Sequence, residues 1–160
     1  MSKDDKFRTV RGYQLANMTN DKLTSSMEDY IEMIYRFRQC DEGIRVTDLA
    51  KRLNVKESSV TKMMKRLADL GLVSYRKYGT IKLTKKGMEV GRFLLSRHEI
   101  VELFLKNICS SEVSLKDVEL IEHNCSLETL RFFHTFNSFL SCHPEIKSMF
   151  KNFKEEFTKE

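Results

Sequence analysis

Carboxylates and imidazoles at helical spacing are the side chains of this sequence best suited to chemistry. Glu119, Glu122 and His123 stand at positions i, i+3 and i+4, so a helix through them would carry all three on one face. An acidic pair with a spacing of three lies near the start of the chain, and one histidine stands alone between the two groups. The candidate ligands are Asp29, Glu32, His98, Glu119, Glu122 and His123. Carboxylates mixed with imidazoles suit Mn²⁺ or Fe²⁺, although each group alone is typical of a solvated helix face.

A second set of side chains, rich in hydroxyls and lysines, could contact DNA. Most of the set falls on the outward face of a helix predicted over residues 57–70. Short hydroxyls there would allow close approach to a groove, and lysines would reach bases or phosphates. The candidates are Thr47, Lys56, Ser58, Ser59, Thr61, Lys62, Lys65, Arg76 and Lys77. Any one of them alone would be an ordinary exposed residue, so the prediction depends on the ordered elements that carry them.

Caps, apolar spacing and glycines predict a winged helix-turn-helix domain that presents these side chains. Ser25 and Glu28 have the spacing of a capping box, and Thr47 is expected to cap the second helix. Gly71 is expected to end the third helix in a left-handed conformation. The predicted elements are helices over residues 25–38, 48–53 and 57–70 and strands over residues 72–75 and 80–83. Two helices with a short turn, followed by a basic hairpin, are typical of a winged helix-turn-helix.

The rest of the chain predicts helices alone. They are a long helix from Thr84 to Asn107, a short one over residues 114–123 and two more that begin at Ser126 and Pro144. The first helix and the short acidic helix should both pack on the long helix, so the candidate ligands could converge. The predicted fold is mainly α: a flexible arm (1–22), a winged helix-turn-helix DNA-binding domain (23–90) and an all-helical domain (91–160).

Charge and composition narrow the class of protein. The net charge is +5, but residues 51–86 hold 11 basic and 2 acidic side chains, whereas residues 98–160 hold 7 and 11. This asymmetry favours a polyanion-binding module joined to a module of different purpose. The four cysteines form no C-x-x-C pair, and no apolar run approaches the length of a membrane span. We therefore expect a cytoplasmic protein that has no membrane partner.

Four motifs in order carry a resemblance to a known family. They are Ser26–Glu32, Ser58–Met63, Arg97–Glu99 and Asp117–His123, and together they resemble the manganese-responsive branch of the DtxR family of metal-dependent repressors. The resemblance implies a homodimer that binds a palindromic double-stranded operator and has no enzyme activity or small-molecule substrate. It also implies that residues 91–160 form a metal-binding and dimerisation domain. The six candidate ligands would bind two Mn²⁺ ions per subunit.

Three alternatives remain open from the sequence. Iron-responsive members of the family have Cys at the position of Glu122 and Met at that of Asp29, so the oxygen ligands here favour Mn²⁺ over Fe²⁺. A dinuclear-manganese hydrolase could use a similar ligand set to activate water, but the sequence has no glycine-rich phosphate loop or separate general base. In the third alternative, a winged-helix regulator without a metal, the acidic residues are ordinary surface residues.

Overall fold

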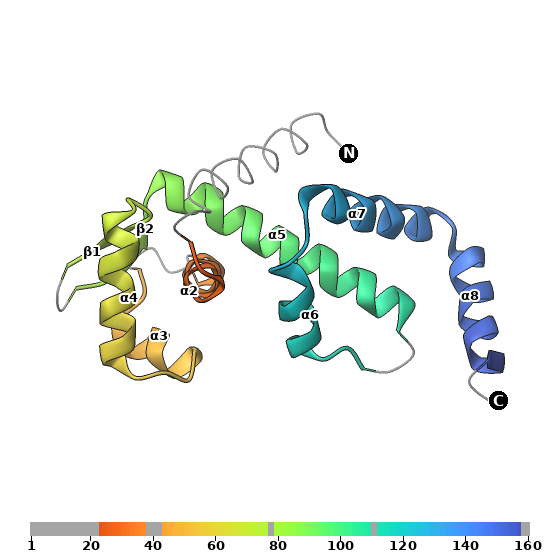
Figure 1. The fold of residues 1–160 in the computed structure, drawn as a ribbon, viewed down its shortest axis with the longest axis horizontal. Coiled ribbons are helices and arrows are strands. Elements are labelled where there is room, and N and C mark those ends of the chain that lie inside the picture. The colour runs from red at the N-terminus through yellow and green to blue at the C-terminus, as the bar shows by residue number, and fades with distance from the viewer. Residues whose placement is uncertain (1–22, 38–42, 77–78, 110–111, 158–160) are drawn as a thin grey trace. The chain divides into compact units, whose positions relative to one another are not determined.

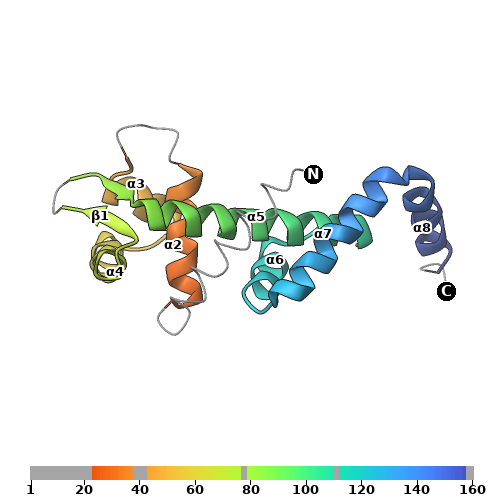
Figure 2. The ribbon, with the colours of Figure 1, turned by 90° about the horizontal axis from the view of Figure 1, so that it is seen from above.

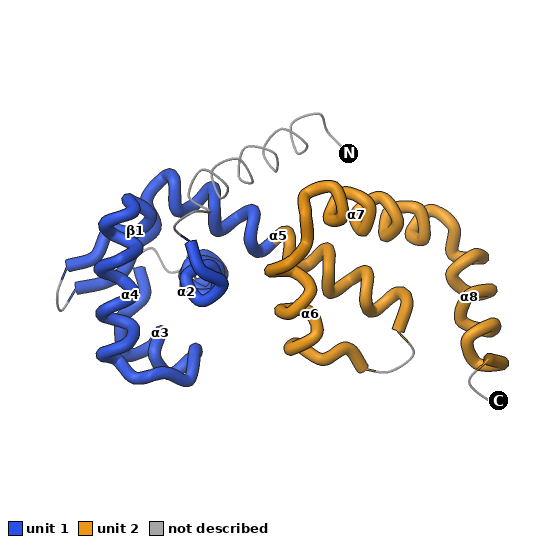
Figure 3. Tube along the Cα trace, in the orientation of Figure 1, with its two compact units in different colours: residues 1–95 blue, residues 96–160 orange. Residues whose placement is uncertain are grey.

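The computed structural model describes residues 23–37, 43–76, 79–109 and 112–157, which hold seven helices and one two-stranded sheet (Figure 1). The chain divides into two compact units, residues 1–95 and 96–160 (Figure 3). The predicted fold class, mainly α with an N-terminal winged helix-turn-helix, is confirmed. The predicted arm over residues 1–22 and the candidate Lys77 lie outside the described residues.

Unit 1 has the order of elements of a winged helix-turn-helix. The elements are α2 (Ser25–Arg36), α3 (Val46–Arg52), α4 (Glu57–Asp69), β1 (Val73–Tyr75), β2 (Ile81–Leu83) and the first part of α5 (Lys85–Ile108). The two strands pair antiparallel, with Val73 opposite Leu83. Ile44 adds an isolated bridge, because its N–H and C=O both bond with Ile81, at 3.1 and 2.8 Å. The sequence did not predict this bridge, because no pattern around Ile44 is typical of a strand.

The core of unit 1 consists of apolar side chains from its helices and strands. The fully buried side chains are Ile31, Leu49, Val60, Met64, Leu67, Leu72, Ile81, Val90 and Leu94. Each contributes about 1.5–3 kcal/mol of hydrophobic stabilisation when it is removed from water. Gly71, which directly follows the last turn of α4, has a φ of 70° and confirms the predicted left-handed end of the helix. The burial therefore holds α4 against α3 and leaves the opposite face of α4 in solvent.

The predicted caps were partly wrong. The cap of α2 is Thr24, whose hydroxyl accepts from the N–H of Met27, so Ser25 lies inside the helix and Glu28 is a buried residue of its first turn. Helix α3 begins one residue before Thr47, so this threonine is not its cap. A capping box depends on backbone angles that several neighbouring hydroxyl residues can satisfy, and sequence spacing does not choose among them.

Helix α5 approaches the backbone just before β1 closely at Gly87. The Thr84 hydroxyl accepts from the Gly87 N–H at 3.0 Å and donates to the Gly71 carbonyl at 2.7 Å, so Thr84 caps the start of α5. A Cβ added to Gly87 would overlap the backbone carbonyl oxygen of Leu72. The close approach therefore requires a residue without a side chain.

We expect Gly87→Ala to destabilise the protein. Alanine in a helix is normally about 1 kcal/mol more favourable than glycine. Here the overlap with the Leu72 carbonyl should reverse the sign and cost about 1–3 kcal/mol, as overpacking does elsewhere. Urea denaturation would measure the free energy of unfolding, with Lys85→Ala at an exposed position of the same helix as the control. A more stable Gly87→Ala protein would show that the two elements do not dock this closely.

Unit 2 contains helices alone. It comprises the remainder of α5 together with α6 (Leu115–Glu122), α7 (Leu127–Cys142) and α8 (Pro144–Phe157) (Figures 1 and 2). The rings of Phe104 and Phe133 stack with centroids 3.9 Å apart, which joins α5 to α7. A buried amide pair joins the same helices, because Asn107 Nδ2 donates to Asn137 Oδ1 at 3.0 Å. These specific contacts set the register of the two helices.

Helix α8 has no buried residue, although it carries an apolar stripe. The exposed apolar residues on it are Ile146, Met149, Phe150, Phe153 and Phe157. Its predicted start at Pro144 and the predicted start of α7 at Ser126 are both confirmed, and Ser126 is the cap residue of α7. In the described part of the chain, every helix is too short or too polar to cross a membrane.

Candidate metal centre and nucleic-acid interface

The buried carboxylate of Glu122 is the centre of the candidate metal site in unit 2. Glu122 occupies the last turn of α6, four residues after the buried Val118, so the apolar face of the helix takes the carboxylate inward with it. Only 2% of Glu122 is exposed. His98, near the middle of α5 and 8% exposed, has its Nδ1 3.2 Å from Glu122 Oε2. The structure thus brings together two of the predicted ligands from helices that are distant in sequence.

This pair fits a cation. Glu122 Oε2 is buried and, apart from the 3.2 Å contact with His98 Nδ1, has no hydrogen-bond partner among the described residues. A buried carboxylate oxygen is costly unless a hydrogen bond or a positive charge compensates it. A carboxylate oxygen next to an imidazole nitrogen is also a donor pair that Mn²⁺ or Fe²⁺ accepts. The residues therefore fit a bound divalent ion at this position.

His123 lies directly after α6 and contacts an arginine. Its Nδ1 is 3.2 Å from Nη2 of Arg97, which is 7% exposed and precedes His98 on α5. Both Arg97 and Glu122 act on the nearby Cys125. Burial raises the pKa of the Cys125 thiol, the guanidinium of Arg97 partly lowers it again, and the carboxylate of Glu122 raises it further. The thiol therefore stays protonated at neutral pH in the metal-free protein.

The remaining predicted ligand of unit 2, Glu119, is exposed. Helical spacing predicted that Glu119, Glu122 and His123 share one face of a helix. It did not predict that their burial differs, with Glu122 in the core and Glu119 in solvent. Sequence reasoning also assigned no role to Arg97. Its one signal was its place beside His98 in a recognised motif, and nothing in that motif indicates contact with His123.

The acidic pair of unit 1 lies on α2. Glu32 is largely buried, and its Oε1 accepts from Nε and Nη2 of Arg36, at 2.9 and 2.7 Å. Asp29, one turn earlier, is exposed. Glu32 therefore already has a cationic partner one turn along its own helix.

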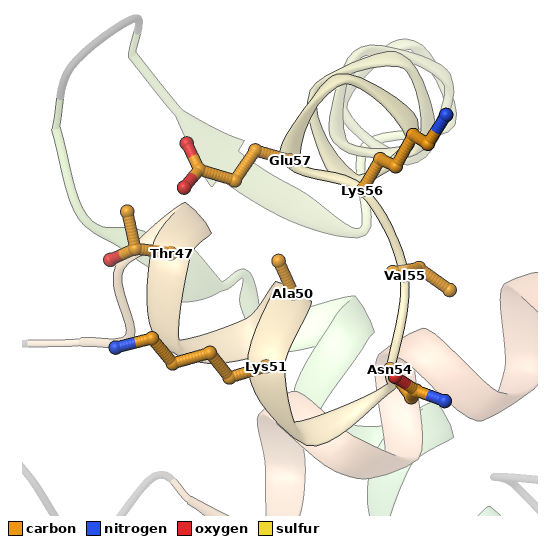
Figure 4. A pocket seen from close by; sticks show the side chains of 7 residues that line it. All are labelled: Thr47, Ala50, Lys51, Asn54, Val55, Lys56 and Glu57. Atoms are coloured by element: carbon orange, nitrogen blue, oxygen red, sulfur yellow. The ribbon is translucent and has the colours of Figure 1, made fainter.

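The candidate DNA-contacting residues lie on the outer surface of unit 1. The exposed members are Thr47, Lys56, Ser58, Ser59, Lys62, Lys65 and Arg76, and Thr61 is half-buried. The turn between α3 and α4 contains Asn54, with a φ of 52°, and borders a surface hollow of about 540 Å³ (Figure 4). Thr47, Lys51 and Lys56 extend around this hollow (Figure 4). The prediction of an exposed hydroxyl and lysine face on α4 agrees with these positions.

The first turns of α3 and α4 add backbone donors to that surface. Neither Arg45 nor Lys56, the residues at the two cap positions, makes a side-chain cap hydrogen bond with the described residues. Uncapped N–H groups at a helix N-terminus, together with the helix dipole, favour phosphate oxygens. The surface can therefore bind a polyanion through both side chains and backbone.

Two family models match the chain in succession. The iron-dependent repressor N-terminal DNA-binding domain matches residues 22–81, and the iron-dependent repressor metal-binding and dimerisation domain matches residues 84–151. Thus the surface of α4 belongs to a domain described as DNA-binding, and the His98–Glu122 pair belongs to one described as metal-binding.

Individual relatives agree with these matches. The HTH-type transcriptional regulator MntR of Geobacillus kaustophilus (strain HTA426) is 46% identical over 104 residues, which are 64% of this chain and 74% of the relative. The regulator of the same name from Bacillus subtilis (strain 168) is 44% identical over 108 residues, 67% of this chain and 76% of the relative.

A solved structure shows the same likeness. It is that of the manganese regulator SloR, which superposes with a TM-score of 0.64 at 28% identity and covers 73% of this chain. The chain spans 55% of SloR's length. On this sequence, fold and site evidence, the chain belongs to the iron-dependent repressor (DtxR) family of DNA-binding, metal-binding transcriptional regulators.

Proposed function

We propose that this protein is a manganese-responsive repressor of metal-uptake genes that binds its operator when Mn²⁺ is bound. The observation that carries the proposal is the buried Glu122 carboxylate, whose Oε2 has no hydrogen-bond partner among the described residues apart from the 3.2 Å contact with His98 Nδ1. A divalent ion could bind to the carboxylate oxygen and the imidazole nitrogen of this pair together. The names of the MntR relatives and of the manganese regulator SloR support Mn²⁺ as that cation.

The proposed site binds two Mn²⁺ ions per subunit. Its ligands are Asp29, Glu32, His98, Glu119, Glu122 and His123. His98 and Glu122 are supported by the contact between their side chains, whereas Asp29, Glu32, Glu119 and His123 are supported by their motifs. The ions would neutralise the negative charge of these acidic side chains, and we propose that this neutralisation favours the state that binds the operator.

The proposed DNA contacts follow from α4 and its neighbours. The hydroxyls and lysines of α4 would enter the major groove, and Thr47, Lys56, Arg76 and Lys77 would contact the backbone of the duplex. A homodimer on a palindromic double-stranded operator would present two such helices about one DNA turn apart. The exposed apolar residues of α7 and α8 supply surface for dimerisation, in the domain matched as metal-binding and dimerisation.

The alternatives have less support. An iron-responsive repressor of the same family would prefer a softer ligand than the carboxylate of Glu122. A hydrolase would leave the exposed basic and hydroxyl face of α4 without a role, so we propose a regulator that is not an enzyme. We also propose that it acts in the cytoplasm.

Selection of DNA by the full-length protein tests the proposal. A pool of random-sequence duplexes would be selected in parallel with Mn²⁺, with Fe²⁺ under anaerobic conditions and with EDTA, and the enriched sequences would be compared. We expect Mn²⁺ to enrich a palindrome that then binds at least a hundredfold more weakly in EDTA. A hundredfold effect corresponds to raising the DNA-binding fraction of the protein from about 1% to 99%. Mn²⁺ achieves this if it binds the DNA-binding state about 10⁴-fold more tightly than the other state. Equal enrichment in EDTA would contradict the proposal, and enrichment by Fe²⁺ alone would favour the iron-responsive alternative.

A further inference from the structure

A fixed positive charge already sits at one of the proposed ligand atoms. Arg97 Nη2 lies 3.2 Å from Nδ1 of His123, and Arg97 is only 7% exposed. Both residues belong to unit 2, Arg97 on α5 and His123 directly after α6. This contact is therefore part of the metal-free unit itself.

The chemistry of the two groups determines which one donates. A guanidinium has only N–H donors, so the hydrogen bond requires a lone pair on Nδ1 of His123. A neutral imidazole has one lone pair and one N–H, so the proton of His123 is then on Nε2. With Nδ1 accepting from Arg97 and Nε2 protonated, neither nitrogen of His123 can bind a metal ion.

We propose that Arg97 competes with the metal for Nδ1 of His123 and thereby sets the metal concentration at which this ligand engages. The inference rests on the proposed function, because it takes His123 as a metal ligand. Binding of an ion at His123 requires the guanidinium to leave Nδ1. The guanidinium of Arg97 is therefore replaced at His123 by the metal ion. Arg97 acts through His123 as a positioning residue and opposes metal binding at this ligand when the metal concentration is low.

The electrostatics around Glu122 agree with this role. In the metal-free protein, the guanidinium of Arg97 supplies a positive charge in the same region as the buried carboxylate, since both charges act on the Cys125 thiol. A buried carboxylate needs such a charge when no metal is bound. Arg97 therefore stabilises the metal-free state, and this stabilisation is what an incoming ion must overcome.

Arg97→Met is the main test, because methionine keeps the aliphatic length of arginine without a donor or a charge. Mn²⁺ binding to the full-length variant would be measured by calorimetry and by the loss of the free Mn²⁺ signal in electron paramagnetic resonance. Loss of one charge-assisted hydrogen bond predicts about a tenfold lower dissociation constant for the His123-dependent ion. Arg97→Lys, which keeps a cationic donor, is expected to remain near the wild type. Arg92→Met on the same helix is the matched control, since Arg92 is exposed and its Nε lies 3.4 Å from the Tyr35 hydroxyl.

A second measurement does not depend on how well the variant folds. In ¹⁵N spectra of the metal-free wild-type protein, His123 should show a protonated Nε2 and an acceptor Nδ1, and Mn²⁺ or diamagnetic Zn²⁺ should abolish that pattern. A His123 that has its proton on Nδ1 in the metal-free protein would overturn the inference.

One further variant separates failure of this inference from failure of the proposed function. If His123→Gln weakens Mn²⁺ binding but Arg97→Met does not tighten it, the competition is wrong while the ligand assignment stands. If His123→Gln leaves both Mn²⁺ sites unchanged, His123 is not a ligand and the inference falls with that part of the proposed site. A lower dissociation constant in Arg97→Met that disappears in the double variant supports the competition.

Discussion

Glu122→Gln is expected to abolish Mn²⁺-dependent DNA binding while leaving the metal-free protein as stable as before, or more stable. The amide keeps the shape of the side chain but removes the negative charge that a cation needs. Loss of a direct ligand should raise the Mn²⁺ dissociation constant by about a hundredfold or more, since even supporting groups around a metal cost 10–100-fold. In the metal-free protein, a neutral amide is cheaper to bury than a carboxylate, and Glu122 is 2% exposed.

Two measurements on the same variant check this result. Calorimetry would give the Mn²⁺ affinity, and urea denaturation in EDTA would give the free energy of unfolding without metal. Glu99→Gln, an exposed carboxylate next to His98, is the matched control and should bind Mn²⁺ as the wild type does. Wild-type Mn²⁺ affinity in Glu122→Gln would exclude this carboxylate as a ligand. A large loss of metal-free stability would show instead that its role is structural.

Removing both Lys62 and Lys65 is expected to weaken operator binding by about a thousandfold. Both lysines are exposed on α4, where they would reach phosphates or base edges. A dimer would lose four charge-assisted contacts of about 1 kcal/mol each. If all four lysines contact phosphate, the log–log dependence of affinity on salt should become shallower by about 3 to 4.

Fluorescence anisotropy with the selected operator in Mn²⁺, over a range of salt concentrations, measures this effect. Lys116→Ala removes an exposed lysine of α6 in unit 2 and should leave both the affinity and the salt slope unchanged. An unaltered affinity together with an unaltered slope for the double variant would place the DNA-binding surface elsewhere than α4. A weaker affinity with an unaltered slope would instead indicate that the two lysines read base edges.

The sequence by itself determined the order of elements in unit 1 and the side chains that form its core. Val60, Met64 and Leu67 recur at helical spacing, and burying that stripe leaves the serines and lysines of α4 exposed. Gly71 was equally predictable, because a left-handed residue after a helix is easiest for glycine. Local periodicity and local backbone preference both act within a few residues, so one sequence is enough to show them.

Only the tertiary structure decided which of the acidic residues could matter most. Glu119 and Glu122 have the same side chain on one short helix, but only Glu122 is taken inward by the packing that buries Val118. The contact between Arg97 and His123 joins residues 26 positions apart on different helices, and no local pattern predicts it. The true cap of α2, Thr24, was also missed because neighbouring hydroxyl residues compete for one set of backbone angles. Burial and long-range pairing depend on how helices pack, and a pattern within one helix contains no information about its partner.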